Sequence, residues 1–188
     1  MNWETSFVKS LNHWGQSHVS LVELVANKFV YLAILIGALS FIYTQYREAT
    51  KPIFSALNIR VTITEGLLKL VFPVGIAAVV SEIISKLFDR ARPFVDHSDI
   101  KLLFAHSEDG GLPSHHMVFT VAIAVCVMGW SLKTSYVVLA LALLSGIARV
   151  AAGIHYPTDI LLGILIGALI PWIFSKFLRA LKVSKNRS

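Results

Sequence analysis

Apolar residues fill four long stretches in the later part of the chain, and polar residues collect between them. These stretches run over residues 64–88, 115–132, 135–154 and 158–181. Each comes close to the length of about 20 residues that a helix needs to cross a bilayer. We expect a transmembrane helix from each, and the short turn around Lys133 makes the helices on its two sides antiparallel neighbours.

The first third of the chain carries a weaker apolar pattern. Between residues 19 and 44 three polar residues interrupt it, and we expect one tilted or broken helix ending near Gln45. Residues 1–18 mix aromatic and basic side chains with a rough helical period but are too short to span, which predicts an interfacial helix rather than a catalytic element. The polar stretch 45–60, which contains Pro52, predicts a loop.

Composition agrees with a protein embedded in lipid. The 188 residues are 55% hydrophobic and 15% charged, with a mean hydropathy of +0.68, too apolar for a soluble domain of this size. The expected fold class is all-α, a single integral membrane domain over residues 1–188 with about five to six transmembrane helices. The start of the chain lacks the pattern of a removed signal peptide, and the single Cys126 excludes a disulfide framework.

The net charge of +6 points to the headgroups of a lipid bilayer and not to nucleic acid, because the basic residues are scattered at segment ends. Alternation of the spans puts Arg47, Lys133 and the basic tail 182–188 at one face. The positive-inside tendency makes that face cytoplasmic. The polar loop 89–112 then lies on the outward side of a bacterial plasma (inner) membrane, toward the periplasm or exterior, on the same side as the motifs described next.

One polar corner between the last two apolar stretches holds Arg149, His155 and Asp159 at a membrane edge. Such a group is costly there unless its members serve one another or a ligand. Pro157 suits the first turn of a helix, so His155 lies just outside that start, within about one turn of Asp159. A carboxylate at that distance fixes the tautomer of an imidazole, and a guanidinium fork suits an oxyanion. The alternative is a polar corner whose charges pair only with one another.

A second cluster, Pro113-Ser114-His115-His116, directly precedes an apolar helix. Ser114 is suited to cap that helix, and a helix start offers free amides and a positive dipole end to phosphate. His116 would stand beside the bound anion as a proton donor. Taken alone, the cluster could also be a cap with interfacial histidines.

A third cluster ends the span before the long polar loop and contains Lys86, Arg90 and Arg92. Arginine followed by proline at a helix exit is common and weakly specific. The alternative interpretation is that these side chains reach lipid headgroups, with Lys86 paired to Glu82 one turn earlier.

Together and in this order, the three clusters resemble the type 2 phosphatidic acid phosphatase (PAP2) family. The family pattern is a lysine, six residues and Arg-Pro; then Pro-Ser-Gly-His; then Ser-Arg, five residues, His, three residues and Asp. The resemblance spans about residues 86–159, and the spacing of Arg149, His155 and Asp159 is its most specific part. It implies a PAP2-like helical bundle and a phosphatase.

The resemblance also implies roles for single residues. His155 would be the nucleophile that forms a phosphohistidine, Asp159 would orient it, and His116 would be the general acid. The phosphate-binding set would be completed by cations, a hydroxyl and a backbone amide: Arg92, Ser114, His115 and Arg149. Water would hydrolyse the intermediate, and the chemistry needs no metal and no cofactor.

The chain departs from the family pattern at three places. Ala148 replaces a serine, His115 replaces a glycine, and Ser85 occupies the lysine position, with Lys86 one place late. On a helix that offset is a rotation of about 100 degrees, which puts Lys86 in question as a phosphate ligand and makes Arg90 the alternative source of charge. Small bacterial undecaprenyl-diphosphate phosphatases are similar in size, in the Arg-Pro-Phe exit and in tolerating loss of that lysine.

The expected function is therefore release of the terminal phosphate of undecaprenyl diphosphate to give undecaprenyl phosphate. Phosphatidylglycerophosphate, phosphatidic acid and lipid A remain alternative substrates, since the motifs recognise the phosphoryl group and not the tail. A different class, a small anion- or lipid-binding transporter, would use the same basic pocket, but we find no internal repeat of the kind transporters carry. The oligomeric state is left open.

The long polar loop also contains residue types that bind metals. Their spacing matches no metal-ligand pattern, and we expect a hydrated loop without a metal site. The residues concerned are His97, His106, Asp96, Asp99, Glu108 and Asp109.

Overall fold

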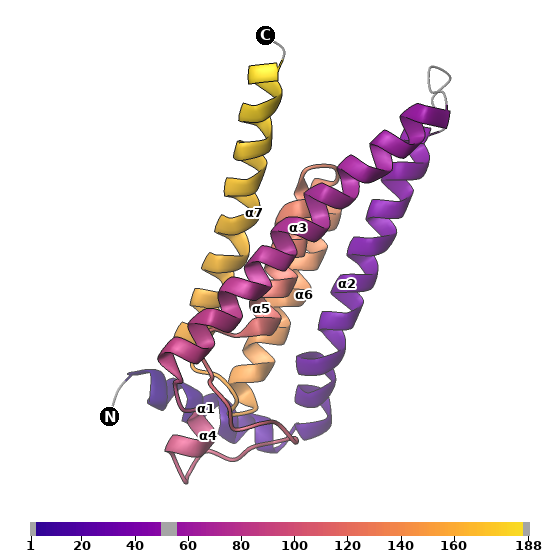
Figure 1. Cartoon of the computed structure of the whole chain (residues 1–188). Helices are drawn as coiled ribbons and strands as arrows, with labels where there is room; N and C mark the ends of the chain where they lie inside the picture. Colours follow the sequence, from indigo (N-terminus) through magenta and orange to yellow (C-terminus); the bar gives the residue numbers. More distant parts are fainter. Residues whose placement is uncertain (1–2, 50–55, 186–188) are drawn as a thin grey trace.

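The computed structural model describes residues 3–49 and 56–185, and every regular element in these ranges is helical (Figure 1). The described residues form seven helices. They are α1 (Trp3–Gln16), α2 (Val19–Ala49), α3 (Ala56–Phe88), α4 (Pro93–Asp96), α5 (His115–Met128), α6 (Leu132–Ala151) and α7 (Pro157–Lys185). Of these, α1 and α4 are short elements outside the bundle of the other five. The expected all-α class is confirmed.

Helix α5 is the centre of the bundle, because α2, α3, α6 and α7 all contact it. Its sequence is apolar on every side, as a helix surrounded by other helices requires. Glycines on α7 allow the closest of these approaches. A Cβ at Gly163 would lie 2.7 Å from the Cβ of Met117, and one at Gly167 would lie 2.6 Å from the carbonyl oxygen of Val118. This packing fixes the start of α5 against the start of α7.

The outer faces of the bundle are apolar and exposed, as lipid contact requires. Four of the described helical segments are long and apolar enough to cross a membrane: Val19–Glu48, Thr64–Asp96, Leu132–Ala151 and Pro157–Leu181. Helix α5 is also apolar but shorter than these. Side chains such as Leu39, Val79 and Leu165 stay exposed on the outside. The chain is a multi-pass membrane protein.

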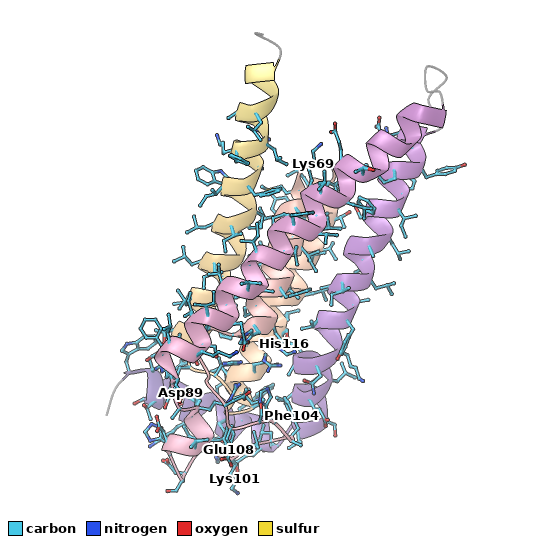
Figure 2. The ribbon with its side chains drawn as sticks, viewed as in Figure 1. Lys69, Asp89, Lys101, Phe104, Glu108 and His116 are labelled. Atoms are coloured by element: carbon cyan, nitrogen blue, oxygen red, sulfur yellow. The ribbon has the colours of Figure 1, made fainter. Side chains whose placement is uncertain are left out.

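The long helices alternate in direction, so the chain has two distinct ends (Figure 1). At one end lie α1, α4, the loop that follows α4, the start of α5 and the α6–α7 turn. At the other end lie the α5–α6 turn and the last residues of α7. Figure 2 shows His116 near the loop that carries Glu108, and Lys69 much farther along the bundle. The three polar clusters therefore share one end.

Some predicted boundaries differ from the observed ones. Helix α2 is unbroken to Ala49 and α3 begins at Ala56, so the loop predicted for residues 45–60 is wrong at both ends; Pro52 lies outside the described residues. Packing of α2 against α3 explains the longer helices, since tertiary contact overrides weak local propensity. Helix α7 continues into the predicted tail as far as Lys185, and residues 186–188 of that tail lie outside the described ranges.

Candidate active site

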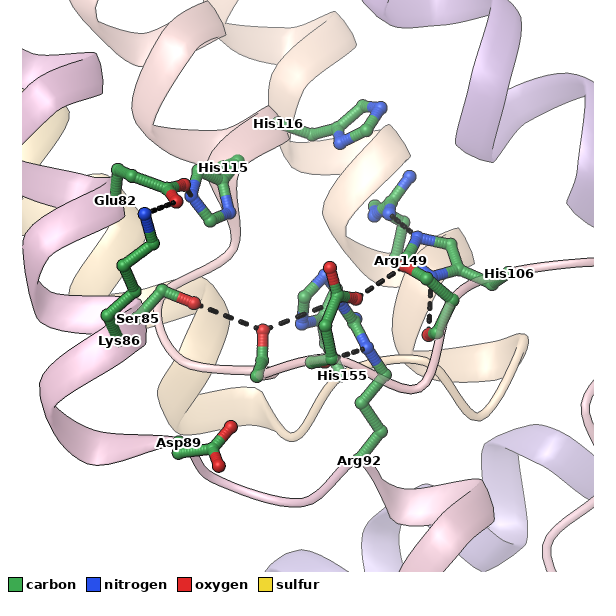
Figure 3. A pocket seen from close by; sticks show the side chains of 13 residues that line it. Glu82, Ser85, Lys86, Asp89, Arg92, His106, His115, His116, Arg149 and His155 are labelled. Carbon is green, nitrogen blue, oxygen red and sulfur yellow. Dashed lines mark hydrogen bonds and ion pairs between the residues drawn. The ribbon is translucent and has the colours of Figure 1, made fainter.

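The three polar clusters line one cavity of about 330 Å³ at the α1 end of the bundle (Figure 3). Its lining joins the end of α3, the loop after α4, the start of α5, the end of α6 and the turn before α7. Every predicted site residue except Arg90, Ser114 and Asp159 belongs to it. The lining residues are Glu82, Ser85, Lys86, Asp89, Arg92, His106, Ser107, Asp109, Gly110, His115, His116, Arg149 and His155.

His155 sits on the turn between α6 and α7, and its side chain is buried. The turn needs a glycine: Gly153 has φ +76°, and a Cβ there would meet Ile100 at 2.8 Å. The ring nitrogen Nδ1 of His155 lies 2.9 Å from the carbonyl oxygen of Gly111. A carbonyl oxygen only accepts, so Nδ1 carries the hydrogen and Nε2 of the neutral ring keeps its lone pair.

The electrostatic surroundings keep that imidazole neutral. Burial, together with the guanidinium groups of Arg149 and Arg92, holds the pKa of His155 well below its ordinary value. The hydrogen bond to Gly111 opposes this effect without reversing it. The result is a fixed tautomer with an unprotonated Nε2, the form in which an imidazole acts as a nucleophile.

Asp159 is fully buried next to His155 but has closer partners. Its Oδ2 accepts the backbone N–H of Tyr156 at 2.7 Å, and its Oδ1 accepts Nη1 of Arg90 at 2.7 Å. The distance from Oδ2 to Nδ1 of His155 is 3.5 Å. The geometry therefore divides the orienting role expected for Asp159: Gly111 takes the ring hydrogen, and Asp159 adds a negative charge beside the ring.

Arg149 presents unused hydrogen-bond donors beside the cavity. Its Nη2 donates to Nε2 of His106 at 2.8 Å, whereas Nε and Nη1 are buried with no partner among the described residues. Ser114 adds a buried hydroxyl without a partner; it occupies the N-cap position of α5, but its side chain makes no capping hydrogen bond. Unpaired buried polar groups are costly, so this cluster is suited to an anionic ligand.

Arg92 is buried and held by carbonyl oxygens. Its Nε donates to the carbonyl oxygen of Asp109 at 2.8 Å and its Nη1 to that of Ile154 at 3.2 Å. Its Nη2 lies 3.4 Å from both Asp109 Oδ1 and the carbonyl oxygen of Gly110. Arg92 thus attaches the loop after α4 to the α6–α7 turn and places a fixed positive charge next to His155.

The open side of the cavity carries a more exposed group of charges. Lys86 Nζ lies 3.0 Å from Glu82, the pair named in the alternative interpretation of this cluster, and Nε2 of His115 lies 3.3 Å from the same carboxylate. His116, one residue further, lines the cavity from the first turn of α5. We call Glu82, Lys86 and His115 the rim of the cavity. Lys86 lines the cavity despite its offset in sequence.

Arg90, which the sequence offered as an alternative phosphate ligand, is not among the residues that line the cavity. Its guanidinium points to the back of the site, where Nη1 binds Asp159 and Thr158 and Nη2 binds Glu4. It also lies 4.1 Å from the centre of the Tyr156 ring. Arg90 is turned away from the cavity because two buried carboxylates, those of Asp159 and Glu4, lie close to its guanidinium and accept charge-assisted hydrogen bonds from it.

Sequence reasoning missed the contribution of the loop itself. His106 lines the cavity, and burial lowers its pKa, which suits an imidazole that accepts a hydrogen bond from Arg149. No sequence pattern predicts this contact, because His106 is 43 residues from Arg149 and lies on an irregular segment. Among residues 3–49 and 56–185, no group of three or more His, Cys, Asp or Glu side chains is arranged to hold a metal ion.

Comparison with protein families gives a match to the PAP2 superfamily over residues 66–182, more than half of the chain. Among curated proteins, the chain is 31% identical over 104 residues to undecaprenyl-diphosphatase BcrC of Bacillus subtilis (strain 168), covering 55% of this chain and 53% of that protein. It is 34% identical over 110 residues to the bacitracin transport permease protein BcrC of Bacillus licheniformis, covering 56% and 54%. The chain spans about half the length of these curated relatives.

Two solved structures share the fold. LpxE of Aquifex aeolicus matches with a TM-score of 0.56 at 22% identity, covering 84% of this chain and 93% of that one. A transmembrane PAP2-type phosphatidylglycerolphosphate phosphatase of Bacillus subtilis matches with a TM-score of 0.61 at 22% identity, covering 96% and 88%. At this identity the likeness concerns the arrangement of helices.

Proposed function

This chain belongs to the PAP2 superfamily, and from that premise we propose that it is a membrane phosphatase that removes the terminal phosphate of undecaprenyl diphosphate. The observation that carries the proposal is the state of His155. Its Nδ1 hydrogen is given to Gly111, its Nε2 is unprotonated, and it faces the same cavity as the unpaired donors of Arg149. A nucleophile and an oxyanion-binding group occupy one site.

In the proposed reaction, Nε2 of His155 attacks the terminal phosphorus atom and forms a P–N bond. The bond from phosphorus to the bridging oxygen breaks, and His116, whose protonated form is favoured by the negative charge of the bound diphosphate, gives its proton to that oxygen. Arg149 and Arg92 stabilise the charge on the phosphoryl oxygens from the cavity lining, and the unpaired hydroxyl of Ser114 lies outside that lining at the start of α5. Water then attacks the phosphorus atom and the P–N bond breaks, while His116, now neutral, takes the proton of the water; inorganic phosphate leaves and His155 is restored. The residues present account for these steps without a metal.

Two observations support a lipid diphosphate as the substrate. First, one curated relative is named an undecaprenyl-diphosphatase, and so is a putative one of Escherichia coli (strain K12) at 34% identity over 108 residues. Second, Lys86 and His115 place basic groups at the rim, beyond the buried cluster around Arg149. A second phosphoryl group next to the cleaved one would meet these groups, whereas a phosphomonoester offers only its glycerol or sugar carbon chain there.

The membrane placement is part of the proposal. The site lies at the end of the bundle opposite the last residues of α7 (Figure 1). Basic residues such as Arg47, Lys133, Lys176 and Arg179 lie toward that other end. By the positive-inside tendency, the cavity faces the exterior or periplasm of a bacterial plasma membrane and the C-terminus faces the cytoplasm. We propose that residues 1–188 act as one integral membrane domain.

A second candidate function rests on one finding, the name of the transport permease relative of Bacillus licheniformis. In that case the cavity would bind an anion without cleaving a bond. A binding site needs Arg149 but has no use for an unprotonated nitrogen on a buried, tautomer-fixed imidazole. Within the phosphatase class, phosphatidylglycerophosphate, phosphatidic acid and lipid A are the competing substrates.

The test is phosphate release by the purified chain in detergent with a chelator present, from undecaprenyl diphosphate and from the competing lipids at matched detergent ratios. We expect the highest kcat/KM for the diphosphate, and loss of turnover with both His155→Ala and Arg149→Ala. Release from none of these lipids contradicts a phosphatase. A binding protein would instead keep lipid-phosphate affinity in His155→Ala and lose it in Arg149→Ala. A higher kcat/KM for a monoester rejects the diphosphate assignment alone.

A further inference from the structure

Outside the cavity lining, the N-terminal helix contributes a buried carboxylate that is connected through Arg90 to Asp159. Glu4 lies in the first turn of α1, a helix that the amphipathic pattern assigns only to the membrane surface. Its Oε1 accepts the hydroxyl of Thr158 at 2.6 Å and the backbone N–H of Thr158 at 3.1 Å. Its Oε2 accepts Nη2 of Arg90 at 3.0 Å. Contact with the membrane surface uses the apolar face of a helix and does not require a buried, fully hydrogen-bonded carboxylate.

Arg90 connects this carboxylate to the one beside the proposed nucleophile. Its Nη1 donates to Asp159 Oδ1 at 2.7 Å while Nη2 donates to Glu4, so each end of the fork has its own carboxylate. Its other Nη1 contact, at 2.7 Å, is the hydroxyl of Thr158, which in turn donates to Glu4. The guanidinium is packed over the ring of Tyr156, which leaves it little freedom to turn.

Asp159 depends on this cation. It is completely buried, and a buried carboxylate whose partner is removed is strongly destabilised. Without Glu4, the partly exposed guanidinium of Arg90 loses the only ion pair at its Nη2 end among the described residues, one of the contacts that orient it toward Asp159. The pKa of Glu4 agrees with a charged group, since the hydrogen bonds from Thr158 and Arg90 lower it by more than burial raises it.

We propose that Glu4 is a positioning residue of the active site, acting through Arg90 on Asp159 and thereby on His155. Helix α1 then contributes to turnover and not only to membrane contact. This inference rests on the proposed function, because its measured quantity is phosphate release. It assigns a role to Arg90 that differs from the phosphate contact expected from its position before Arg92.

Helix α1 also supplies the matched control. Asn12 is buried on the same helix, and its side-chain amide donates to the carbonyl oxygens of Lys101 and Ala151, both at 2.8 Å. Its Oδ1 accepts the backbone N–H of Lys101 at 3.0 Å. Asn12 therefore attaches α1 to the loop and to α6 without contacting Arg90, Asp159 or His155. A variant at Asn12 tests whether any loosening of α1 has the same effect.

The experiment measures kcat, KM and the thermal unfolding midpoint for Glu4→Gln, Arg90→Gln, their double variant and Asn12→Ala. Glu4→Gln keeps the shape and the acceptor for Thr158 but puts an amide against Arg90. We expect kcat to fall about tenfold with KM within about twofold, as for contacting residues that couple strongly. The double variant should be no slower than Arg90→Gln, because Glu4 acts through Arg90. Asn12→Ala should lower the unfolding midpoint and keep kcat within about twofold.

The proposal is overturned if the loss of kcat in the double variant equals the product of the two single losses. It is also overturned if Asn12→Ala loses as much kcat as Glu4→Gln. If Glu4→Gln does not fold, Arg90→Lys decides in its place: it keeps the charge, but an ammonium group lacks the fork that holds two carboxylates, so kcat should again fall about tenfold. A wild-type kcat in Arg90→Lys overturns the inference. Wild-type protein that releases no phosphate from any lipid contradicts the proposed function instead, so the two failures are distinguishable.

Discussion

The cavity has two sides that differ in how their charges are held. Arg149 and His155 on the inner side are 1% and 2% exposed, and each has a defined partner in His106 or Gly111. On the rim, Lys86 is 75% exposed and Glu82 54%, and one carboxylate serves both Lys86 and His115. The rim combines a cation with a carboxylate, whereas the inner side has two buried guanidinium groups, and only the inner side is desolvated and fixed.

The difference indicates a division of work. Electrostatic interactions are stronger where water is excluded, and fixed groups need no rearrangement when charge develops during a reaction. The inner side is therefore suited to the phosphoryl group that is cleaved. Exposed ion pairs contribute little energy and exchange partners readily. The rim is thus suited to the remainder of the headgroup, where it influences affinity and selectivity.

The largest effect in this comparison is expected at Arg149. Arg149→Lys keeps the charge but removes the planar fork and its buried donors, so kcat/KM should fall about 100-fold, as when an oxyanion donor is lost. Steady-state phosphate release from undecaprenyl diphosphate provides the measurement. The matching variant on the rim is Lys86→Met, for which kcat/KM should fall by less than about tenfold. Equal losses in the two variants would erase the distinction between the two sides.

A smaller effect concerns selectivity at the rim. Lys86→Gln should raise KM for a lipid diphosphate about threefold and leave kcat nearly unchanged, because a single exposed charge contributes below about 1 kcal/mol. KM for a lipid phosphomonoester should stay the same. Competition between the two lipids in mixed micelles measures the ratio of their kcat/KM values directly. A loss in kcat with unchanged KM would assign Lys86 to the inner side.

The smallest effect is expected in the dependence of stability on pH. Burial lowers the pKa of His155 and of His106 in the folded protein. In the unfolded chain a histidine takes up a proton near pH 6.5, so below that pH the unfolded state binds more protons and the folded state loses stability as pH falls. One such imidazole contributes at most about 1.4 kcal/mol per pH unit.

Thermal unfolding in detergent between pH 8 and pH 5.5 measures this dependence. His106→Gln keeps an acceptor for Arg149 and removes one titrating ring, so its unfolding midpoint should fall less on acidification than that of the wild type. An unfolding midpoint that rises as pH falls below 6.5 would contradict the direction of both pKa shifts.

The sequence by itself determined the class of the protein and its main chemical groups. An apolar stretch of spanning length forms a helix in lipid, because a single segment can hydrogen-bond all of its own backbone N–H and C=O groups there only as a helix. The spacing of Arg149, His155 and Asp159 identified the third motif, since a turn followed by a helix start fixes their separation over a few residues. Alternation of spans also predicted that the three clusters meet at one end, and they line one cavity.

Only the tertiary structure decided which groups are partners. The contacts of His155 with Gly111, of Arg149 with His106 and of Arg90 with Glu4 join segments 43 to 86 residues apart. Such contacts depend on how an irregular loop and a short surface helix pack against the bundle, and helical periodicity carries no information about either. Contacts between sequence neighbours follow from local geometry. The binding of Arg90 to both Glu4 and Asp159 depends on the burial of these carboxylates, which exists only after the chain has folded.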